Sequence, residues 1–326
     1  MNNRAASGKR DAKNTLLSKK STLAKRWPCY AGSIIRTVFI IGFSYLFLFP
    51  IFYMLVTAVQ DPALLDPSVM WIPKGISLLG FKGAVTSLRL SQSMPLTAVN
   101  TLFSTLASLV SCSMVGYGFA RFKFPFKNLA FALVLLTIIV PPQALIMSNY
   151  LNFFFFDFGG ILSLFGIQIN LLNTPWVFVL PAMFASGLRG GLFIFIFRQF
   201  FQGLPKELEE ASKIDGCGPF RTYTQIMVRL ALPAFMTVLL FSLIWHWNDF
   251  YNSAIYFTGE IKPVPVMLSN LSIAIKQDGI ASTTFITESR MFIQAGILLS
   301  IMPLLVIYLL TQRFFTESIA KSGIVG

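Results

Sequence analysis

The most informative stretch is LPKELEEASKIDGCGPFRTYTQIMVRLALP, residues 204–233, which lies between two long apolar runs. Pro205 suits the first position of a helix, where its missing N–H costs no hydrogen bond. Three acidic side chains follow and crowd the positive end of the helix dipole: Glu207, Glu209 and Glu210. The sequence therefore predicts that a short helix begins near Pro205.

Apolar side chains recur along this helix at three- and four-residue spacing and form one stripe: Leu204, Leu208, Ala211 and Ile214. Gly216 offers the left-handed turn that ends a helix. A second short helix is predicted after Pro219, running through Arg221 to Val228. Because the first helix is acidic at its start, anionic lipid headgroups would repel it. A groove on a protein partner therefore suits it better than a lipid surface.

The composition points to a membrane protein. Of the 326 residues, 55% are hydrophobic and only 12% are charged, whereas a soluble domain carries about 25% charged residues. A soluble enzyme or a free cytosolic binding protein is thereby disfavoured. The three Cys residues and the single His lie far apart in sequence, which argues against a disulfide framework or a Cys/His zinc site.

Several apolar runs have the length of a bilayer-spanning helix. Inside a bilayer all backbone hydrogen bonds must be satisfied, so such unbroken runs are helices. The sequence predicts an all-α membrane protein with six transmembrane helices, at 34–59, 96–120, 129–150, 175–201, 232–257 and 291–310.

The distribution of positive charge sets the predicted topology. Residues 1–33 form a basic tail, and most other Lys and Arg fall on the same side of the six predicted spans. The positive-inside rule places that side in the cytoplasm, together with both termini and the 204–229 loop. The predicted domains are a basic tail at 1–33, a transmembrane domain at 34–312 and a cytoplasmic C-terminal tail at 313–326. This topology accounts for the net charge of +13 without a nucleic-acid partner.

Glu210-Ala211-Ser212 followed by Ile214-Asp215-Gly216 resembles the EAA loop of permease subunits from binding-protein-dependent ABC importers. Further motifs make the chain, over residues 34–326, similar to the carbohydrate-importer type, like the second permease subunit of the maltose system. These motifs are Asn100-Thr101-Leu102, Gly116-Tyr117, Ala120-Arg121, Pro141-Pro142-Gln143, Phe197-Arg198-Gln199-Phe200-Phe201, Trp247-Asn248-Asp249-Phe250 and Gln312-Arg313-Phe314.

The resemblance implies a type I ABC importer permease fold whose 204–229 loop is a coupling helix docked on an ATPase subunit. Glu210 would then make polar contacts with the ATPase, Ala211 would permit close approach, and Gly216 would supply the turn. Leu208, Ser212 and Asp215 complete the expected coupling residues. Two positions depart from the family pattern. Ser212 replaces the third alanine, and Arg229 replaces a proline, which leaves Pro233 to bend the entry into the fifth span.

The resemblance also implies partners: a second permease subunit, two ABC ATPase subunits and an extracytoplasmic solute-binding protein. The chain has no GxxxxGK[ST] phosphate loop, so ATP and Mg would be bound by the ATPase subunits and this chain would not be an enzyme. The expected cargo is a carbohydrate, an oligosaccharide or a modified sugar. The expected location is the cell membrane.

Polar residues in the predicted spans are candidates for the transport pathway. An intramembrane arginine is costly, so Arg189 is a candidate ligand donor, although it would also suit a polar group of the second permease or an interface. Trp245 would stack on a sugar or anchor the helix at the membrane surface. The remaining candidates have structural alternatives, helix packing or local hydrogen bonding: Asn100, Asn248 and Asp249.

Two alternatives remain open from the residues. An importer of the same kind could carry a solute other than a sugar. Asp249 would also suit an ion-coupled secondary transporter, but no second clear intramembrane carboxylate pairs with it in the sequence.

Overall fold

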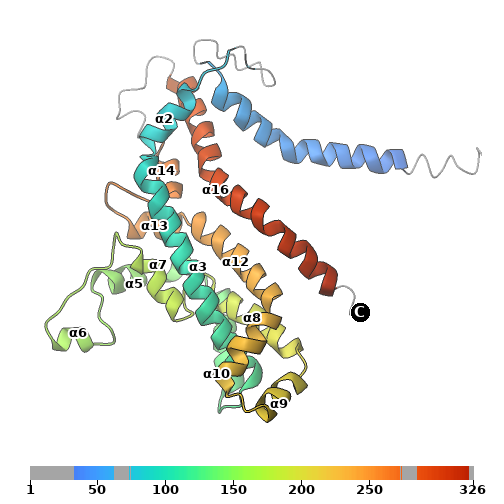
Figure 1. The fold of residues 1–326 in the computed structure, drawn as a ribbon. Coiled ribbons are helices and arrows are strands. Elements are labelled where there is room, and N and C mark those ends of the chain that lie inside the picture. The colour runs from blue at the N-terminus through green and yellow to red at the C-terminus, as the bar shows by residue number, and fades with distance from the viewer. Residues whose placement is uncertain (1–32, 62–72, 74, 272, 274–284, 323–326) are drawn as a thin grey trace, which may run out of the picture.

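The computed structural model describes residues 33–61, 73, 75–271, 273 and 285–322. Apart from two isolated bridges, the regular elements in these ranges are helices, so the all-α prediction is confirmed there. Figure 1 shows an elongated bundle with one helix running along its middle and short helices at both ends. The central helix is α3 (Leu90–Arg121), one end carries α9 (Glu207–Ile214) and α10 (Pro219–Thr222), and the other carries α2 (Leu79–Ser87) and α14 (Val264–Ser269).

Three described helices are long and apolar enough to cross a membrane. They are the helix Ser33–Val59, α3, and the Ser289–Gln312 part of α16 (Phe285–Ser322), with mean hydropathies of 2.2, 1.5 and 2.3. Helices of spanning length were predicted at these three places. Because α16 continues to Ser322, the predicted C-terminal tail starts as helix. The predicted basic tail, except for Ser33, lies outside the described residues.

Proline breaks the third predicted span, 129–150. α4 (Lys127–Ile139) and α5 (Pro142–Phe154) meet at an angle of 100°. A residue before proline disfavours helical backbone, and both Val140 and Pro141 are extended, with ψ angles of 122° and 128°. Pro142 then begins α5, where its missing N–H costs nothing. The run predicted as one helix is therefore a bent pair.

The fifth predicted span, 232–257, consists of two helices, α12 (Leu232–Trp247) and α13 (Tyr251–Tyr256), with a short break between them. Before this span, the segment Pro219–Leu230 meets α12 at 77°. If each of the two bent pairs counts as one span, the described residues hold up to five candidate spans.

The prediction of one continuous helix over 175–201 is wrong. The structure has α7 (Trp176–Met183) and α8 (Gly190–Gly203), joined by a tight turn in which Ala185 and Arg189 have φ angles of 57° and 60°. A Cβ on Gly190 would collide with the Ala185 carbonyl oxygen, so glycine permits this close reversal. Arg189 consequently precedes α8 and does not lie in the middle of a helix.

The best-packed part of the bundle lies around α3. This helix packs against α7, α8 and α12, and aromatic rings from α8 fill the space beside it. The fully buried side chains of this core include Phe193, Phe197, Phe201, Met227 and Val238. Trp247 at the end of α12 donates its indole N–H to the Ser300 carbonyl oxygen at 3.0 Å, which ties α12 to α16. The core thus fixes the end of α3 beside the 204–229 segment.

Candidate functional site

The 204–229 segment, called the α9 loop below, contains the predicted helix, turn and second helix. α9 begins at Glu207, two residues after Pro205, and its first turn holds the three predicted glutamates. Gly216 has a φ of +77°. The Cys217 N–H donates to the Ser212 carbonyl at 2.9 Å and the Gly216 N–H to the Lys213 carbonyl at 3.0 Å. This is a Schellman ending, which requires the left-handed residue that the sequence places there.

A buried ion pair holds the α9 loop against the end of α3. Arg121 Nε lies 3.1 Å from Glu209 Oε1, without the alignment of a hydrogen bond, and only 5% and 14% of these side chains are exposed. Arg121 Nη2 also donates to the Leu204 carbonyl oxygen at 2.7 Å. Removing one partner of a buried pair leaves an uncompensated charge, so this contact fixes the position of α9.

A second contact holds α9 against α10. The hydroxyl of Ser212, which is 2% exposed, lies 2.9 Å from the hydroxyl of Thr222 on α10. Thr222 in turn donates to the Gly218 carbonyl oxygen at 3.2 Å. Ser212 therefore faces the interior of the helix–turn–helix, where an alanine would lack this hydrogen bond.

Most of the predicted coupling residues are exposed, on α9 or on the turn that ends it. Glu210, Ala211, Asp215 and Gly216 are exposed, whereas Leu208 is half-buried. The predicted apolar stripe is divided, because Leu204 and Leu208 face inward in part while Ile214 is 88% exposed. Sequence reasoning missed Phe220, an exposed ring on α10, and the pairing of Glu209 with Arg121.

The α9 loop is connected to α12 through an unusual stretch of helix. Residues Tyr223–Met227 form a π-helical turn, followed by α11 (Val228–Leu230) and the 77° bend. The Tyr223 hydroxyl lies 2.7 Å from the hydroxyl of Ser113 on α3. π-helical turns interrupt helices frequently at functional sites. The bend is present although Arg229 replaces the family proline.

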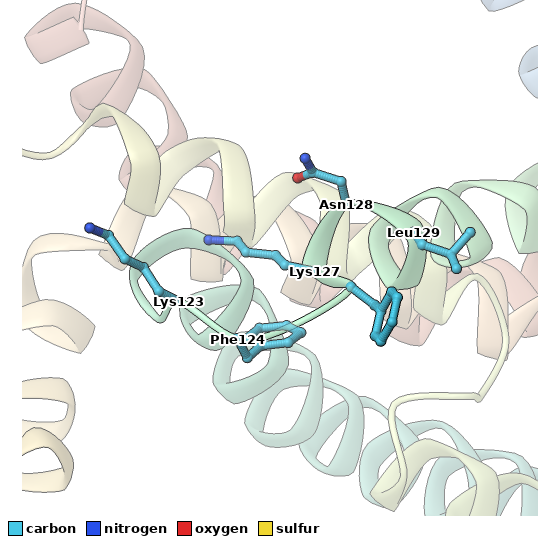
Figure 2. A pocket seen from close by; sticks show the side chains of 6 residues that line it. Lys123, Phe124, Lys127, Asn128 and Leu129 are labelled. Carbon is cyan, nitrogen blue, oxygen red and sulfur yellow. The ribbon is translucent and has the colours of Figure 1, made fainter.

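A shallow, basic hollow of about 490 Å³ lies beside the turn from α3 to α4. Figure 2 shows its side chains: Lys123, Phe124, Phe126, Lys127, Asn128 and Leu129. Lys127 donates to the Phe122 carbonyl oxygen at 2.9 Å. The turn follows Arg121 directly, so these positive charges lie at the same end of the bundle as the α9 loop.

Two of the predicted pathway residues meet in the structure. The guanidinium carbon of Arg189 lies 5.5 Å from the centroid of the Trp245 ring. Trp245 stacks against Phe193 and Phe241, with centroid distances of 5.8 and 5.3 Å. A cation over an indole face is attracted by the ring quadrupole. The contact links the turn before α8 to the C-terminal half of α12, and Arg189 itself stays exposed.

The other pathway candidates make local contacts. Asn248 donates to the Ile244 carbonyl oxygen at 2.9 Å. Asp249 accepts the Ser253 N–H at 3.0 Å and the Asn252 side-chain amide at 2.9 Å, which stabilises the start of α13. Asn100 is buried in α3, and its side-chain oxygen has no hydrogen-bond partner. Asn248 and Asp249 therefore bond within their own segment of the chain.

A second hollow, of about 500 Å³, lies between α3 and α7 and is mainly apolar. Its lining includes Phe103, Val110, Met114, Trp176 and Met183, with Ser111 as the one hydroxyl. Among the described residues no group of three or more His, Cys, Asp or Glu is placed to hold a metal ion.

Comparison with known proteins agrees with these features. Residues 112–321, more than half of the chain, match the family described as "Binding-protein-dependent transport system inner membrane component". The chain is 27% identical over 308 residues to the arabinooligosaccharides transport system permease protein AraQ of Bacillus subtilis (strain 168), covering 90% of this chain and 96% of that protein.

Two further matches extend over most of the chain. The probable starch degradation products transport system permease protein AmyC of Thermoanaerobacterium thermosulfurigenes is 24% identical over 283 residues, covering 86% of this chain and 93% of that protein. A crystal structure of a bacterial ABC transporter involved in the import of the acidic polysaccharide alginate has a chain with a TM-score of 0.69 and 19% identity, covering 87% of this chain and 96% of that chain. It shows the same fold. The chain therefore belongs to the family of binding-protein-dependent transport system inner membrane components.

Proposed function

We propose that this chain is one permease subunit of an ABC importer and works beside a second permease subunit, two ATPase subunits and an extracytoplasmic solute-binding protein. Its transmembrane domain, 34–312, would cross the membrane six times, with α7 and α8 together forming the fourth crossing. The tail at 1–33, the loop at 204–229 and the tail at 313–326 would then lie in the cytoplasm. Family membership and the spanning helices support this proposal.

The observation that carries the proposal is the outward face of α9. The Arg121–Glu209 pair and the Ser212–Thr222 hydrogen bond fix the helix from inside the chain. The outward face leaves an isoleucine, an alanine and charged side chains free to contact a protein groove. In this proposal α9 is the coupling helix, Glu210 and Asp215 make polar contacts with the ATPase, and Ala211 allows close approach.

Two of the expected coupling residues take another role in this proposal. Ser212 is buried against Thr222 and Leu208 is half-buried, so they position the helix without touching the ATPase. Ile214 and Phe220, with 88% and 69% exposure, supply the apolar contact instead. Such exposed apolar side chains next to charges are typical anchors of a protein interface.

The same contacts suggest how ATP drives transport. The ATPase subunits would bind ATP and Mg and hydrolyse the nucleotide. Their closure would move α9, and the buried Tyr223 would carry that movement through the π-helical turn and the bend to α12. The far half of α12 carries Trp245, which contacts Arg189. A shift of α12 would therefore alter this contact inside the pathway.

We propose a carbohydrate as the cargo, an oligosaccharide or a modified sugar. The names of the matched proteins support this class, since they mention arabinooligosaccharides, starch degradation products and alginate. A further relative, 28% identical over 223 residues, is named for the uptake of osmoprotective compounds in Synechocystis. Small osmolytes therefore belong in any test.

The test is uptake by the complete complex in vesicles, supplied with its solute-binding protein and a panel of neutral oligosaccharides, acidic oligosaccharides, an osmolyte and an amino acid. ATP-dependent uptake of a sugar is expected. Uptake of the osmolyte or the amino acid alone would contradict the cargo. Uptake that continues with inactive ATPases and stops when an ion gradient collapses would contradict the transporter class.

The pathway role of Arg189 has a separate test. Replacing Arg189 by Ala removes the cation over Trp245, which is worth about 0.5–1 kcal/mol at an exposed site, and also removes the donors. Uptake should fall while the complex assembles normally, and Arg189→Lys, which keeps the charge, should restore part of it. Normal uptake by Arg189→Ala would remove the residue from the pathway.

A further inference from the structure

The connection between α5 and α7 forms an apolar projection at the side of the bundle. We call residues 155–169 the α6 loop, after the short helix α6 (Ile161–Leu164) at its tip. Figure 1 shows α6 standing away from the other helices. Its large apolar side chains are exposed, with Leu164 at 83% and Phe165 at 73%. The others are Phe155, Phe158, Ile161, Ile167 and Ile169.

The α6 loop is almost free of charge. Between residues 128 and 188 the single charged side chain is that of Asp157. Its carboxylate accepts hydrogen bonds from the N–H of Leu162 at 2.8 Å and the N–H of Ser163 at 3.3 Å. Backbone donors of the same loop therefore stabilise the negative charge. The polar side chains Gln168 and Asn170 lie where the loop returns to the bundle, beside the apolar Ile167 and Ile169. The exposed side chains of the loop are therefore mainly apolar.

The backbone of the α6 loop satisfies much of its own hydrogen bonding. Phe156 donates to the Ile169 carbonyl at 2.9 Å across the base. Phe165 and Ile167 both donate to the Leu162 carbonyl at 3.0 Å, and Gly166 donates to the Ser163 carbonyl at 3.0 Å. Segments that enter lipid must satisfy their polar backbone internally. The α6 loop meets much of this requirement without a regular helix of spanning length.

The distribution of the apolar side chains indicates what surrounds them. Ile161, Leu164 and Phe165 recur at three- and four-residue spacing, so they share one face of this short turn, and all three are exposed. No charged side chain lies beside them in the sequence except Asp157, whose carboxylate is bonded within the loop. An apolar face of this kind suits the boundary between headgroups and acyl chains.

We propose that the tip of the α6 loop inserts into the bilayer, at the boundary of phospholipid headgroups and acyl chains, and anchors the α5–α7 end of the bundle there. The apolar side chains contact acyl chains, and Gln168 and Asn170 lie at the headgroups. The outer leaflet follows from the proposed six-span topology, whereas the lipid contact itself does not depend on that topology.

The test places a nitroxide at Leu164→Cys in the complete complex in phospholipid nanodiscs, with the signal of the labelled parent complex subtracted. Phe47→Cys on the helix Ser33–Val59 serves as the lipid-facing control, and Thr258→Cys after α13 serves as the polar control. The label at residue 164 should be as accessible to oxygen as the label at residue 47. Its accessibility to a water-soluble nickel complex should be much lower than that of the label at residue 258.

Two other results would overturn the proposal. Nickel access at residue 164 equal to that at residue 258 would place the loop in water. Low access to both oxygen and nickel would place it against protein, such as the second permease subunit. A wrong topology would appear separately, as labelling of Thr258→Cys from the ATPase side. Retained ATP hydrolysis by each complex serves as the check on folding.

Discussion

The α9 loop and the α6 loop both expose large apolar side chains, and Ile214 at 88% and Leu164 at 83% are almost equally exposed. Their surroundings differ. Ile214 lies among Glu210, Lys213 and Asp215, on a helix that an ion pair fixes to α3. The α6 loop has one charged side chain, Asp157, and backbone N–H groups of the same loop donate to it. Exposure alone therefore does not identify what covers an apolar side chain, and the neighbouring charges distinguish a protein partner from lipid.

The largest expected effect tests how firmly the α9 loop is held. Arg121→Ala leaves Glu209 buried and unpaired, which costs about 3 kcal/mol in such pairs. The α9 loop should lose its position, and the ATPase subunits should dissociate during purification. Arg89→Ala is the matched control, because the Arg89–Glu260 pair has a distance of 2.9 Å but is exposed and is worth at most about 1 kcal/mol. Equal loss of ATPase in both variants would contradict the role of the buried pair.

The next effect compares the two exposed apolar side chains, Ile214 in the α9 loop and Leu164 in the α6 loop. Ile214→Glu should leave the fold intact, because the residue is exposed, and should weaken ATPase binding about 30-fold, the equivalent of a 2 kcal/mol interface anchor. Leu164→Glu should leave ATPase binding unchanged. Binding of labelled ATPase to the two permease complexes in nanodiscs measures both. If the Leu164 variant lost the ATPase and the Ile214 variant kept it, the assignment of the two loops would be reversed.

A smaller effect concerns the turns that end each loop's helix. Gly216 has φ +77°, and nothing lies within 4 Å of a Cβ built there, so Gly216→Ala costs only backbone strain, about 1–2 kcal/mol. ATPase binding should weaken accordingly. Gly166→Ala, at φ +68° in equally open space, should strain the α6 loop without changing ATPase binding. Gly218→Ala, at φ −72°, should change neither, and a loss there would show that the turn geometry is not the cause.

The smallest effect is a pH dependence confined to the α6 loop. The Ser163 side chain, and after it backbone N–H groups, lower the pKa of Asp157 below its usual value. A lowered folded-state pKa gives stability that is present at neutral pH and lost as the pH falls through that pKa. A spin label at residue 164 should therefore become more mobile in acid. Asp157→Asn should abolish this change, and an unaltered pH response in that variant would exclude Asp157 as its source.

The features that could be predicted from the sequence are those with local causes. The acidic residues at the start of α9 and the glycine after its end predicted the helix and its turn. Three unbroken apolar runs predicted helices of spanning length. Pro141 and Pro142 were visible in the sequence, but the 100° angle at which α4 and α5 meet required the structure.

The remaining features depend on contacts between distant segments. Residues 184–189 read as a continuation of an apolar helix, and the turn there results from the close approach of Gly190 to Ala185. The pairing of Arg121 with Glu209 could not be predicted, because nothing local links the end of α3 to α9. Arg189 and Trp245 were each candidates, and their contact required the fold. Asp249 was a candidate for transport, whereas its hydrogen bonds stabilise the start of α13.

The most direct test of the central claim, that α9 docks on an ATPase, is photo-cross-linking in the complete complex. A photoreactive side chain at residue 214 is compared with one at residue 164. The α9 loop probe should give a covalent adduct with the ATPase subunit, and the α6 loop probe should give adducts with lipid and none with the ATPase. An α9 probe that reacts only with lipid, or with the solute-binding protein, would contradict the account.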